Sequence, residues 1–255
     1  MEMLSTILVA TVICSITTVI IYRMQAITTN QPSINSCEKS KKCHLHLVGI
    51  LGSGGHSSEM VSLLRDIDPA RYIHRSYIAS SGDSFAYSRA LEIETYIQSK
   101  FRPSGPTPAK TWDPLTGIWD LRIVPRARKI HQPLITTIFS SLLCAIGCLK
   151  ELRSIKKASR ATSSGYPDVI ISNGPATAVI FILVAALMRV SGMSPLRKMK
   201  TIYVESWARV DSLSLSGRFL LSLGICDRFL VQWESLARKI NKKGTKVQWA
   251  GFLVE

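Results

Sequence analysis

The chain has 255 residues, enough for one large domain or two small ones, and either would bury a hydrophobic core. Its formal net charge of +15 indicates an acidic partner, such as an anionic lipid, a phosphorylated ligand or nucleic acid. Nucleic acid is disfavoured because the basic residues are dispersed and no zinc-finger spacing or aromatic RNA-binding signature occurs. We therefore expect a membrane or phosphate-bearing partner and no nucleic acid.

The first element is a predicted transmembrane anchor at residues 1–23. Leu4 to Tyr22 contains 19 residues and no charge, and ten of them are Leu, Ile or Val, which favours insertion by about 3 to 6 kcal/mol. A cleaved signal peptide is the alternative, but a basic n-region and a small-x-small cleavage site are both missing. The basic residues after the span predict that the rest of the chain faces the cytosol. Residues 24–43 are polar and turn-rich, which is typical of a linker.

The globular region is predicted at residues 44–255, and it opens on a glycine-rich turn. An apolar run typical of a buried strand, Leu45 to Leu51, precedes the turn, and a helix is predicted from Ser57. Glycines allow a tight reversal, and bare amides with the positive end of the helix form an anion site. The candidate anion-binding residues are Gly52, Ser53, Gly54 and Gly55. A turn without a ligand is the alternative, because no P-loop lysine follows.

Strands and helices alternate through the rest of the chain. Strands are predicted at 73–80, 121–124, 167–171, 201–205, 228–231 and 247–249, and helices at 57–67, 85–100, 134–149, 176–190 and 213–223, with a proline-rich loop at 103–114. This alternation predicts one α/β domain, Rossmann-like and doubly wound, with a parallel sheet. Turns that follow parallel strands gather at one sheet edge, so Ser172, Asn173 and Gly174 are predicted to join the glycine turn in binding an anion.

A basic patch precedes an uncharged segment, Leu134 to Leu149. The segment would be about 24 Å long as a helix, short of the roughly 30 Å hydrocarbon core, so a second span is not expected. It is predicted to be either a core helix or an interfacial helix beside anionic headgroups. Arg126 and Arg128, in the basic patch, are added to the candidate anion-binding residues, with an anionic headgroup or a lipid diphosphate as the ligand.

The six cysteines do not indicate a metal site. They include no Cys-x-x-Cys pair and no matching histidine spacing, so we expect neither a metal nor another cofactor. Cys144 and Cys148, one helical turn apart, are predicted to be small core residues. This usage fits a reduced cytosolic compartment.

Five stretches of the chain together resemble one family. They are Gly52–His56 with Glu59–Met60, Val124–Arg128, Ser172–Pro175, Tyr203–Arg209 and Asp227–Trp233. They are similar to the membrane-anchoring subunit of the two-subunit UDP-N-acetylglucosamine transferase of dolichol-linked oligosaccharide assembly. The resemblance implies a single-pass protein of the endoplasmic reticulum membrane. It also implies addition of the second GlcNAc to dolichyl-diphosphate-GlcNAc, on the cytosolic face, for protein N-glycosylation.

The resemblance implies a division of labour between two chains. This chain would be the acceptor-side half of a GT-B glycosyltransferase, and a soluble catalytic subunit would bind most of the UDP-GlcNAc. The strands expected here make only a single sheet, whereas a complete transferase of that kind needs a second nucleotide-binding domain. Activity is therefore expected only with the partner. A self-sufficient membrane-anchored glycosyltransferase and a purely structural membrane receptor are the alternatives.

Two residues are candidates for the catalytic base of this transfer. His56 lies on the glycine turn, and histidine side chains exchange protons near neutral pH. Glu205 follows a later strand. The alternatives are a hydrogen-bonded loop histidine and a buried carboxylate that orders the loop around Trp207.

The carboxyl-terminal segment is apolar, which is unusual for a free terminus. It is predicted to dock on the partner through Trp249, Phe252, Leu253 and Val254. The alternative is that the segment closes the domain's own sheet.

Overall fold

The computed structural model describes most of the globular region. The described residues are 18, 21–23, 25, 44–100, 111–128, 132–158, 165–174, 176–242, 244 and 247–253. Most of the predicted anchor (1–23) and linker (24–43) lies outside them, although residues 21–23 are helical. The prediction of an amino-terminal transmembrane helix therefore stays a prediction.

An eight-stranded sheet forms the centre of the domain, in the order β3-β4-β2-β1-β5-β6-β7-β8. The strands are β1 (His46–Ile50), β2 (His74–Ser80), β3 (Trp112–Asp113), β4 (Gly117–Val124), β5 (Val169–Ser172), β6 (Lys200–Val204), β7 (Arg228–Val231) and β8 (Gln248–Trp249). All neighbouring pairs are parallel except β3 with β4. Leaving out β3, the order from β4 to β7 is that of a doubly wound Rossmann sheet, which confirms the predicted Rossmann-like α/β fold.

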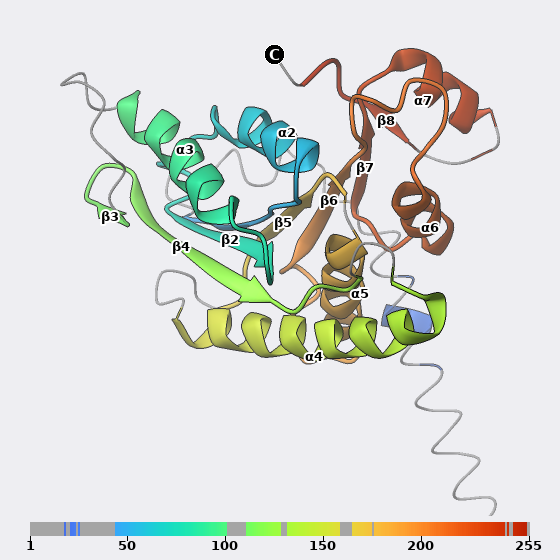
Figure 1. The fold of residues 1–255 in the computed structure, drawn as a ribbon, viewed down its shortest axis with the longest axis horizontal. Helices are drawn as coiled ribbons and strands as arrows, with labels where there is room; N and C mark the ends of the chain where they lie inside the picture. The colour runs from blue at the N-terminus through green and yellow to red at the C-terminus, as the bar shows by residue number, and fades with distance from the viewer. Residues whose placement is uncertain are drawn as a thin grey trace, which may run out of the picture.

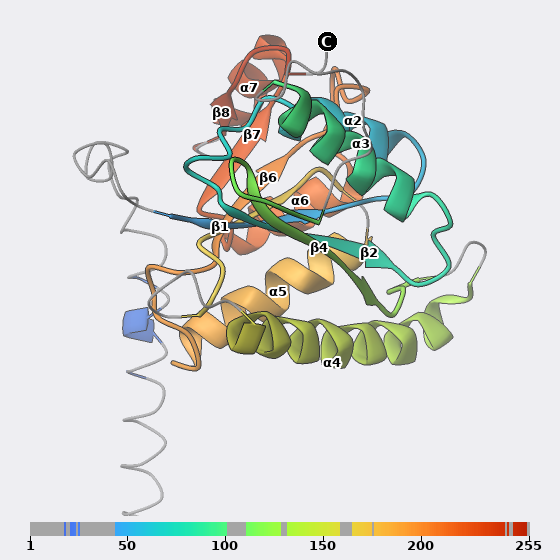
Figure 2. The ribbon, with the colours of Figure 1, turned by 90° about the vertical axis from the view of Figure 1, so that its left-hand side faces the viewer.

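Helices cover both faces of this sheet (Figures 1 and 2). The helices α2 (Gly55–Leu64) and α3 (Ala86–Ser99) lie on one face, and α4 (Leu134–Ala158) and α5 (Ala176–Val190) lie on the other. Two shorter helices, α6 (Leu215–Leu223) and α7 (Glu234–Asn241), contribute to a third apolar cluster with α5 and β7. The turns that enter α2 and α5 therefore leave the sheet toward opposite faces.

The central strand β1 is buried on both sides, as expected for a parallel strand between helical layers. Val48 and Ile50 belong to the cluster under α4 and α5, while Leu47 belongs to the cluster under α2 and α3. A buried ion pair stabilises the packing of the α2 and α3 layer on the sheet. In this pair, Nε of Arg75 donates to Glu94 Oε1 at 2.6 Å. Glu94 lies on α3 and Arg75 on β2, so this pair fastens the helix to the sheet.

The structure corrects several predicted boundaries. The helix α4 continues to Ala158, nine residues past its predicted end, because the lysines and arginine that follow the apolar run are good helix formers. The length argument against a second membrane span was therefore wrong. The strand β4 starts at Gly117 rather than at Leu121, and β3 and α7 were not predicted.

Candidate functional site

The site forms where the sheet reverses its winding, between β1 and β5. These strands are parallel neighbours, with Ile50 opposite Ser172 at their carboxyl ends. The chain runs from β1 toward β2 on one side and from β5 toward β6 on the other. Ligands of open α/β sheets bind in the crevice at such a point. The structure thus brings together the two turns that were predicted to meet.

The glycine turn presents open backbone at the start of α2. Gly54 has φ 64° and ψ −132°, a conformation that favours glycine, and no side chain caps the helix. A Cβ atom added at Gly54 or Gly55 would meet nothing within 4 Å, so the space above the turn is free. The first turn of α2 carries no acidic residue. Its amides and the helix dipole therefore favour an anion.

The turn after β5 holds His56 in two ways. Asn173 Nδ2 donates to the carbonyl oxygen of His56 at 2.7 Å. A Cβ atom at Gly174, where φ is 147°, would lie 2.8 Å from Nδ1 and Cε1 of the imidazole. The ring thus packs flush against a position that only glycine can occupy. His56 Nδ1 is buried and has no hydrogen-bond partner among the described residues.

Glu59 is a residue of the candidate site that was not predicted from the sequence. It lies on the buried side of α2 and is only 4% exposed. Ser206 Oγ donates to Glu59 Oε1 at 2.5 Å, and Asn173 Nδ2 donates to Glu59 Oε2 at 3.1 Å. One carboxylate therefore joins α2 to the loops after β5 and β6. The available signal was an acidic residue next to the apolar positions Met60, Val61 and Leu64 on the buried face of the helix.

Glu205, by contrast, faces the amino terminus of α6. Its Oε2 accepts hydrogen bonds from the backbone N and from Oγ of Ser214, both at 3.1 Å. A Cβ atom at Gly217 would collide with the same oxygen. Burial raises the pKa of Glu205, although the hydrogen bonds from Ser214 oppose that shift. This geometry favours a role in ordering the loop, and the base role of Glu205 stays a prediction.

The basic segment after β4 lies next to the start of α5. The Ala127 amide, between the two arginines, donates to Thr177 Oγ1 at 3.2 Å, and Thr177 belongs to the first turn of α5. Arg126 is half-buried and its amide donates to Ser81 Oγ, while the exposed Arg128 donates to the Gln132 carbonyl. The segment is thus fastened beside the turn after β5, and no hydrogen bond between the arginine side chains and either turn is seen in the described residues.

The carboxyl-terminal segment packs on the domain and keeps two aromatic side chains exposed. Trp249 pairs with Val231 at the edge of the sheet, so the segment does extend the domain's own sheet. The Leu253 amide donates to Gln232 at 3.1 Å, and Phe252 packs edge-on against Trp233 at 5.8 Å. Trp249 and Phe252 nevertheless remain about half exposed. Val254 lies outside the described residues, and docking on a partner stays a prediction.

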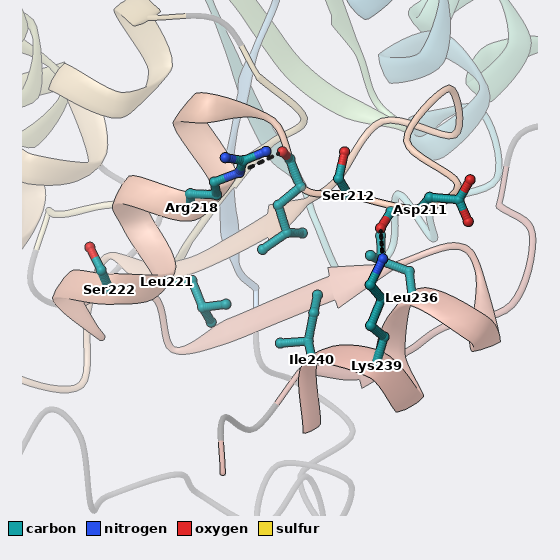
Figure 3. Close-up of a pocket in the computed structure, with 9 residues that line it drawn as sticks. Asp211, Ser212, Arg218, Leu221, Ser222, Leu236, Lys239 and Ile240 are labelled. Atoms are coloured by element: carbon teal, nitrogen blue, oxygen red, sulfur yellow. Dashed lines mark hydrogen bonds between the residues drawn. The ribbon is translucent and has the colours of Figure 1, made fainter. Parts of the chain in front are cut away.

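A separate cavity of about 610 Å³ lies between α6 and α7 (Figure 3). Its lining is largely apolar, and Arg218 and Lys239 each donate to a backbone carbonyl at its edge. The lining residues are Asp211, Ser212, Leu213, Arg218, Leu221, Ser222, Leu236, Lys239 and Ile240. None of the predicted site residues contributes to it, so it is distinct from the candidate site at the two turns.

The helix α4 exposes a large apolar surface. Among the described residues, α4 is the one helix that is long and apolar enough to cross a membrane, from Ile135 to Lys157. Only 17% of its most apolar stretch is buried. The other side of α4 packs on the core through Cys144, Cys148, Leu152 and Ile155, so the helix lies along the domain. Both cysteines are fully buried, which confirms their prediction as core residues.

A doubly wound sheet with two facing turns at its switch point defines a Rossmann-like α/β domain. The family model described as "Oligosaccharide biosynthesis protein Alg14 like" matches residues 47–253. The chain belongs to the Alg14 family.

Curated relatives from fungi and mouse carry one name, UDP-N-acetylglucosamine transferase subunit Alg14. The Aspergillus fumigatus protein is 37% identical over 233 residues, which cover 77% of this chain and 100% of the relative. The Schizosaccharomyces pombe protein is 36% identical over 204 residues, 80% of this chain and 83% of the relative. The mouse protein is 28% identical over 198 residues, 78% of this chain and 80% of the relative.

Proposed function

We propose that this chain is the acceptor-binding and anchoring subunit of a UDP-N-acetylglucosamine transferase in N-glycan precursor assembly. The complex adds the second GlcNAc to dolichyl-diphosphate-GlcNAc. The observation that carries this proposal is the meeting of two turns around His56 at the switch point of the sheet. Membership of a family whose curated members are named transferase subunits supplies the reaction class.

In the proposed mechanism, the turns hold the diphosphate of the lipid acceptor. The open amides of Gly54 and Gly55 and the positive end of α2 bind its oxygens, and Arg126 and Arg128 add positive charge nearby. The acceptor hydroxyl oxygen then forms a bond to the anomeric carbon of the donor, while the bond from that carbon to the UDP oxygen breaks. His56 accepts the hydroxyl proton as this occurs.

The donor site lies mainly on a soluble catalytic subunit in this proposal. The described residues of this chain contain one sheet, the acceptor-side half of a GT-B enzyme, and the partner supplies the other half. Trp249 and Phe252 are exposed aromatic side chains at the sheet edge, and such residues are enriched at protein interfaces. Together with Leu253 and Val254 they form the proposed docking segment.

The membrane side of the domain is the side of α4 and α5. Exposed apolar side chains on the first half of α4 include Ile135, Phe139 and Leu142, and the same helix then exposes Lys150 and Arg153. An apolar end that continues into a basic end suits the boundary between acyl chains and anionic headgroups.

The amino-terminal anchor fits the same side. Nη1 of Arg23 donates to the carbonyl of Arg189, at the end of α5, at 3.2 Å. The helical residues just before Arg23 therefore reach the domain beside α5, which packs on α4. We propose a single-pass protein of the endoplasmic reticulum membrane whose domain faces the cytosol and rests on the bilayer through α4.

Partner dependence tests the proposal. Affinity purification of the full chain from membranes should recover a soluble Rossmann-like subunit, and only the two together should transfer GlcNAc from UDP-GlcNAc to dolichyl-diphosphate-GlcNAc. Full activity of the purified chain alone would favour a self-sufficient transferase. A complex that keeps full activity when Gly54 and Gly55 are both replaced by Asp would favour a purely structural receptor, since two carboxylates there repel a diphosphate.

A further inference from the structure

The carboxylate of Glu59 is buried without a cation beside it. No salt bridge to Glu59 occurs in the described part of the chain, and its two oxygens accept hydrogen bonds from Ser206 and Asn173. Burying a charge is costly unless it is well paired, and an apolar residue would fill this position more cheaply. Packing alone therefore does not account for a carboxylate at this position.

Glu59 determines how the Asn173 amide is oriented. An ionised carboxylate only accepts hydrogen bonds, so it requires Nδ2 of Asn173 to point toward α2. The same nitrogen donates its second hydrogen to the His56 carbonyl. Asn173 is fully buried, and its Oδ1 has no hydrogen-bond partner among the described residues. In this orientation Nδ2 of Asn173 donates two hydrogen bonds, and Oδ1 is left without a hydrogen-bond partner among the described residues.

We infer that Glu59 is a positioning residue that fixes His56 and the glycine turn through Asn173. Ser206 holds the carboxylate from the β6 side, and Asn173 passes the constraint to the backbone of His56. The imidazole is then pressed against Gly174 in one orientation. Glu59 does not touch the substrate in this account. The inference rests on the proposed function, because it assigns Glu59 a task in the same transfer.

Two substitutions of Glu59 are expected to have different effects on the position of His56. Glu59→Ala leaves the Asn173 amide without its acceptor, so the amide is free to rotate and the His56 backbone is released. Glu59→Gln keeps one oxygen for Asn173 and turns its own amide toward Ser206, whose hydroxyl also accepts hydrogen bonds. Glutamine therefore preserves the geometry although it removes the charge.

The test uses full-length chain in complex with its soluble partner, with kcat and KM measured for dolichyl-diphosphate-GlcNAc at saturating UDP-GlcNAc. A misplacement of about 1 Å can cost about 100-fold, so Glu59→Ala should lower kcat/KM for the acceptor by about that factor. Glu59→Gln should stay within about fivefold of wild type, and KM for UDP-GlcNAc, measured in a separate series at saturating acceptor, should change less than about twofold in both.

A double mutant tests whether Glu59 acts through Asn173. Asn173→Ala should reproduce the loss, and Glu59→Ala with Asn173→Ala should fall no more than about threefold below the weaker single variant. If Glu59→Ala does not assemble, Asn173→Ala and Glu59→Gln carry the comparison. Glu94→Gln is the matched control, since Glu94 is equally buried but bonds to Arg75; it should lower the melting temperature and leave the acceptor KM unchanged.

Three results would overturn the inference. Full activity of Glu59→Ala removes any role for the carboxylate. A Glu59→Gln complex that melts like wild type yet is as inactive as Glu59→Ala shows that the charge itself acts. Multiplicative losses in the double mutant show that the two residues act independently. Absence of transfer by the wild-type complex would overturn the proposed function and this inference together.

Discussion

Two groups of polar residues that each include histidine lie at opposite ends of β1, and they differ in what surrounds them. At the amino-terminal end of β1, His46 stacks on His74 with ring centroids 3.8 Å apart and hydrogen-bonds Ser76 Oγ at 2.9 Å. Ser76 in turn donates to Asp120 at 2.5 Å. The residue types are those of a hydrolytic triad, yet His46 and Ser76 are fully buried.

The difference shows what makes a site in this fold. His46 is enclosed, and its burial lowers the pKa to about 3, whereas half-buried His56 lies beside the open backbone of Gly54 and Gly55. The first cluster lies at the end of the strands where α/β folds do not bind ligands, and the second lies at the switch point. Position in the fold and openness to solvent, rather than residue type, separate the proposed site around His56 from the buried cluster around His46.

The largest expected effect comes from exchanging the two histidines for alanine. His56→Ala should lower turnover of the complex by about 10² to 10⁴-fold, the range for loss of a general base, with little change in melting temperature. His46→Ala should instead destabilise the chain, by about 2 to 4 kcal/mol, and leave the turnover of folded complex near wild type. Turnover and thermal unfolding measured on both variants check that one loses activity and the other loses stability. Equal turnover losses in the two would erase the distinction.

Gly174→Ala is expected to have a smaller effect on catalysis than His56→Ala. The new methyl group would meet the His56 ring at 2.8 Å, and φ of 147° is strained for alanine. The ring must move, so we expect a loss of about tenfold or more in kcat/KM. Gly244→Ala is a matched control with positive φ and no atom within 4 Å of the added methyl group. Acceptor kinetics that are equally weakened in both variants would contradict the role of this contact.

The buried cluster should also give the domain a measurable pH dependence of stability. The folded pKa of His46, about 3, lies below its ordinary 6.5, so the unfolded chain binds the proton more readily. The contribution of neutral His46 to the free energy of unfolding is present above pH 6.5 and is lost as the pH falls toward 3. Between pH 6.5 and 4.5 the loss should be about 2 to 3 kcal/mol. Urea unfolding of wild type and His46→Leu at the two pH values measures it, and identical pH dependence would contradict this origin.

The smallest effect is expected at the arginines of the basic segment after β4. Arg128 is exposed, so Arg128→Ala should raise the acceptor KM only about three- to tenfold, and added salt should narrow the difference. Steady-state kinetics at low and high ionic strength check this, with exposed Arg238→Ala on α7 as the control. A salt-independent defect would mean that Arg128 acts through structure rather than charge.

The sequence predicted elements well where apolar runs ended at polar turns. The bounds of α5 and β7 agree with the prediction, and both turns at the switch point were found because strand-ending glycine and asparagine are strong local signals. The end of α4 was missed because the apolar run stopped at Leu149 while the helix continued in charged residues. Local pattern does not reveal where an amphipathic helix stops.

The two turns of the candidate site could be predicted from the sequence, whereas the partners of its buried carboxylates could not. The glycines of the two turns carry a local signal, but the importance of Glu59 depends on Ser206 and Asn173, which lie more than 100 residues away in sequence. Glu205 follows β6 as a candidate base should, and only the structure reveals Ser214 and the start of α6 beside its carboxylate. Tertiary partners decide the role of a buried carboxylate.

The central claim is that the two turns at the switch point bind the lipid acceptor. Photo-crosslinking tests it most directly, with a dolichyl-diphosphate-GlcNAc analogue that carries the reactive group on its sugar, applied to the full-length complex. The account predicts crosslinks to peptides containing Gly52–His56 or Ser172–Gly174, which unlabelled acceptor suppresses. Competed crosslinks confined to the cavity between α6 and α7, with none at the turns, would contradict it.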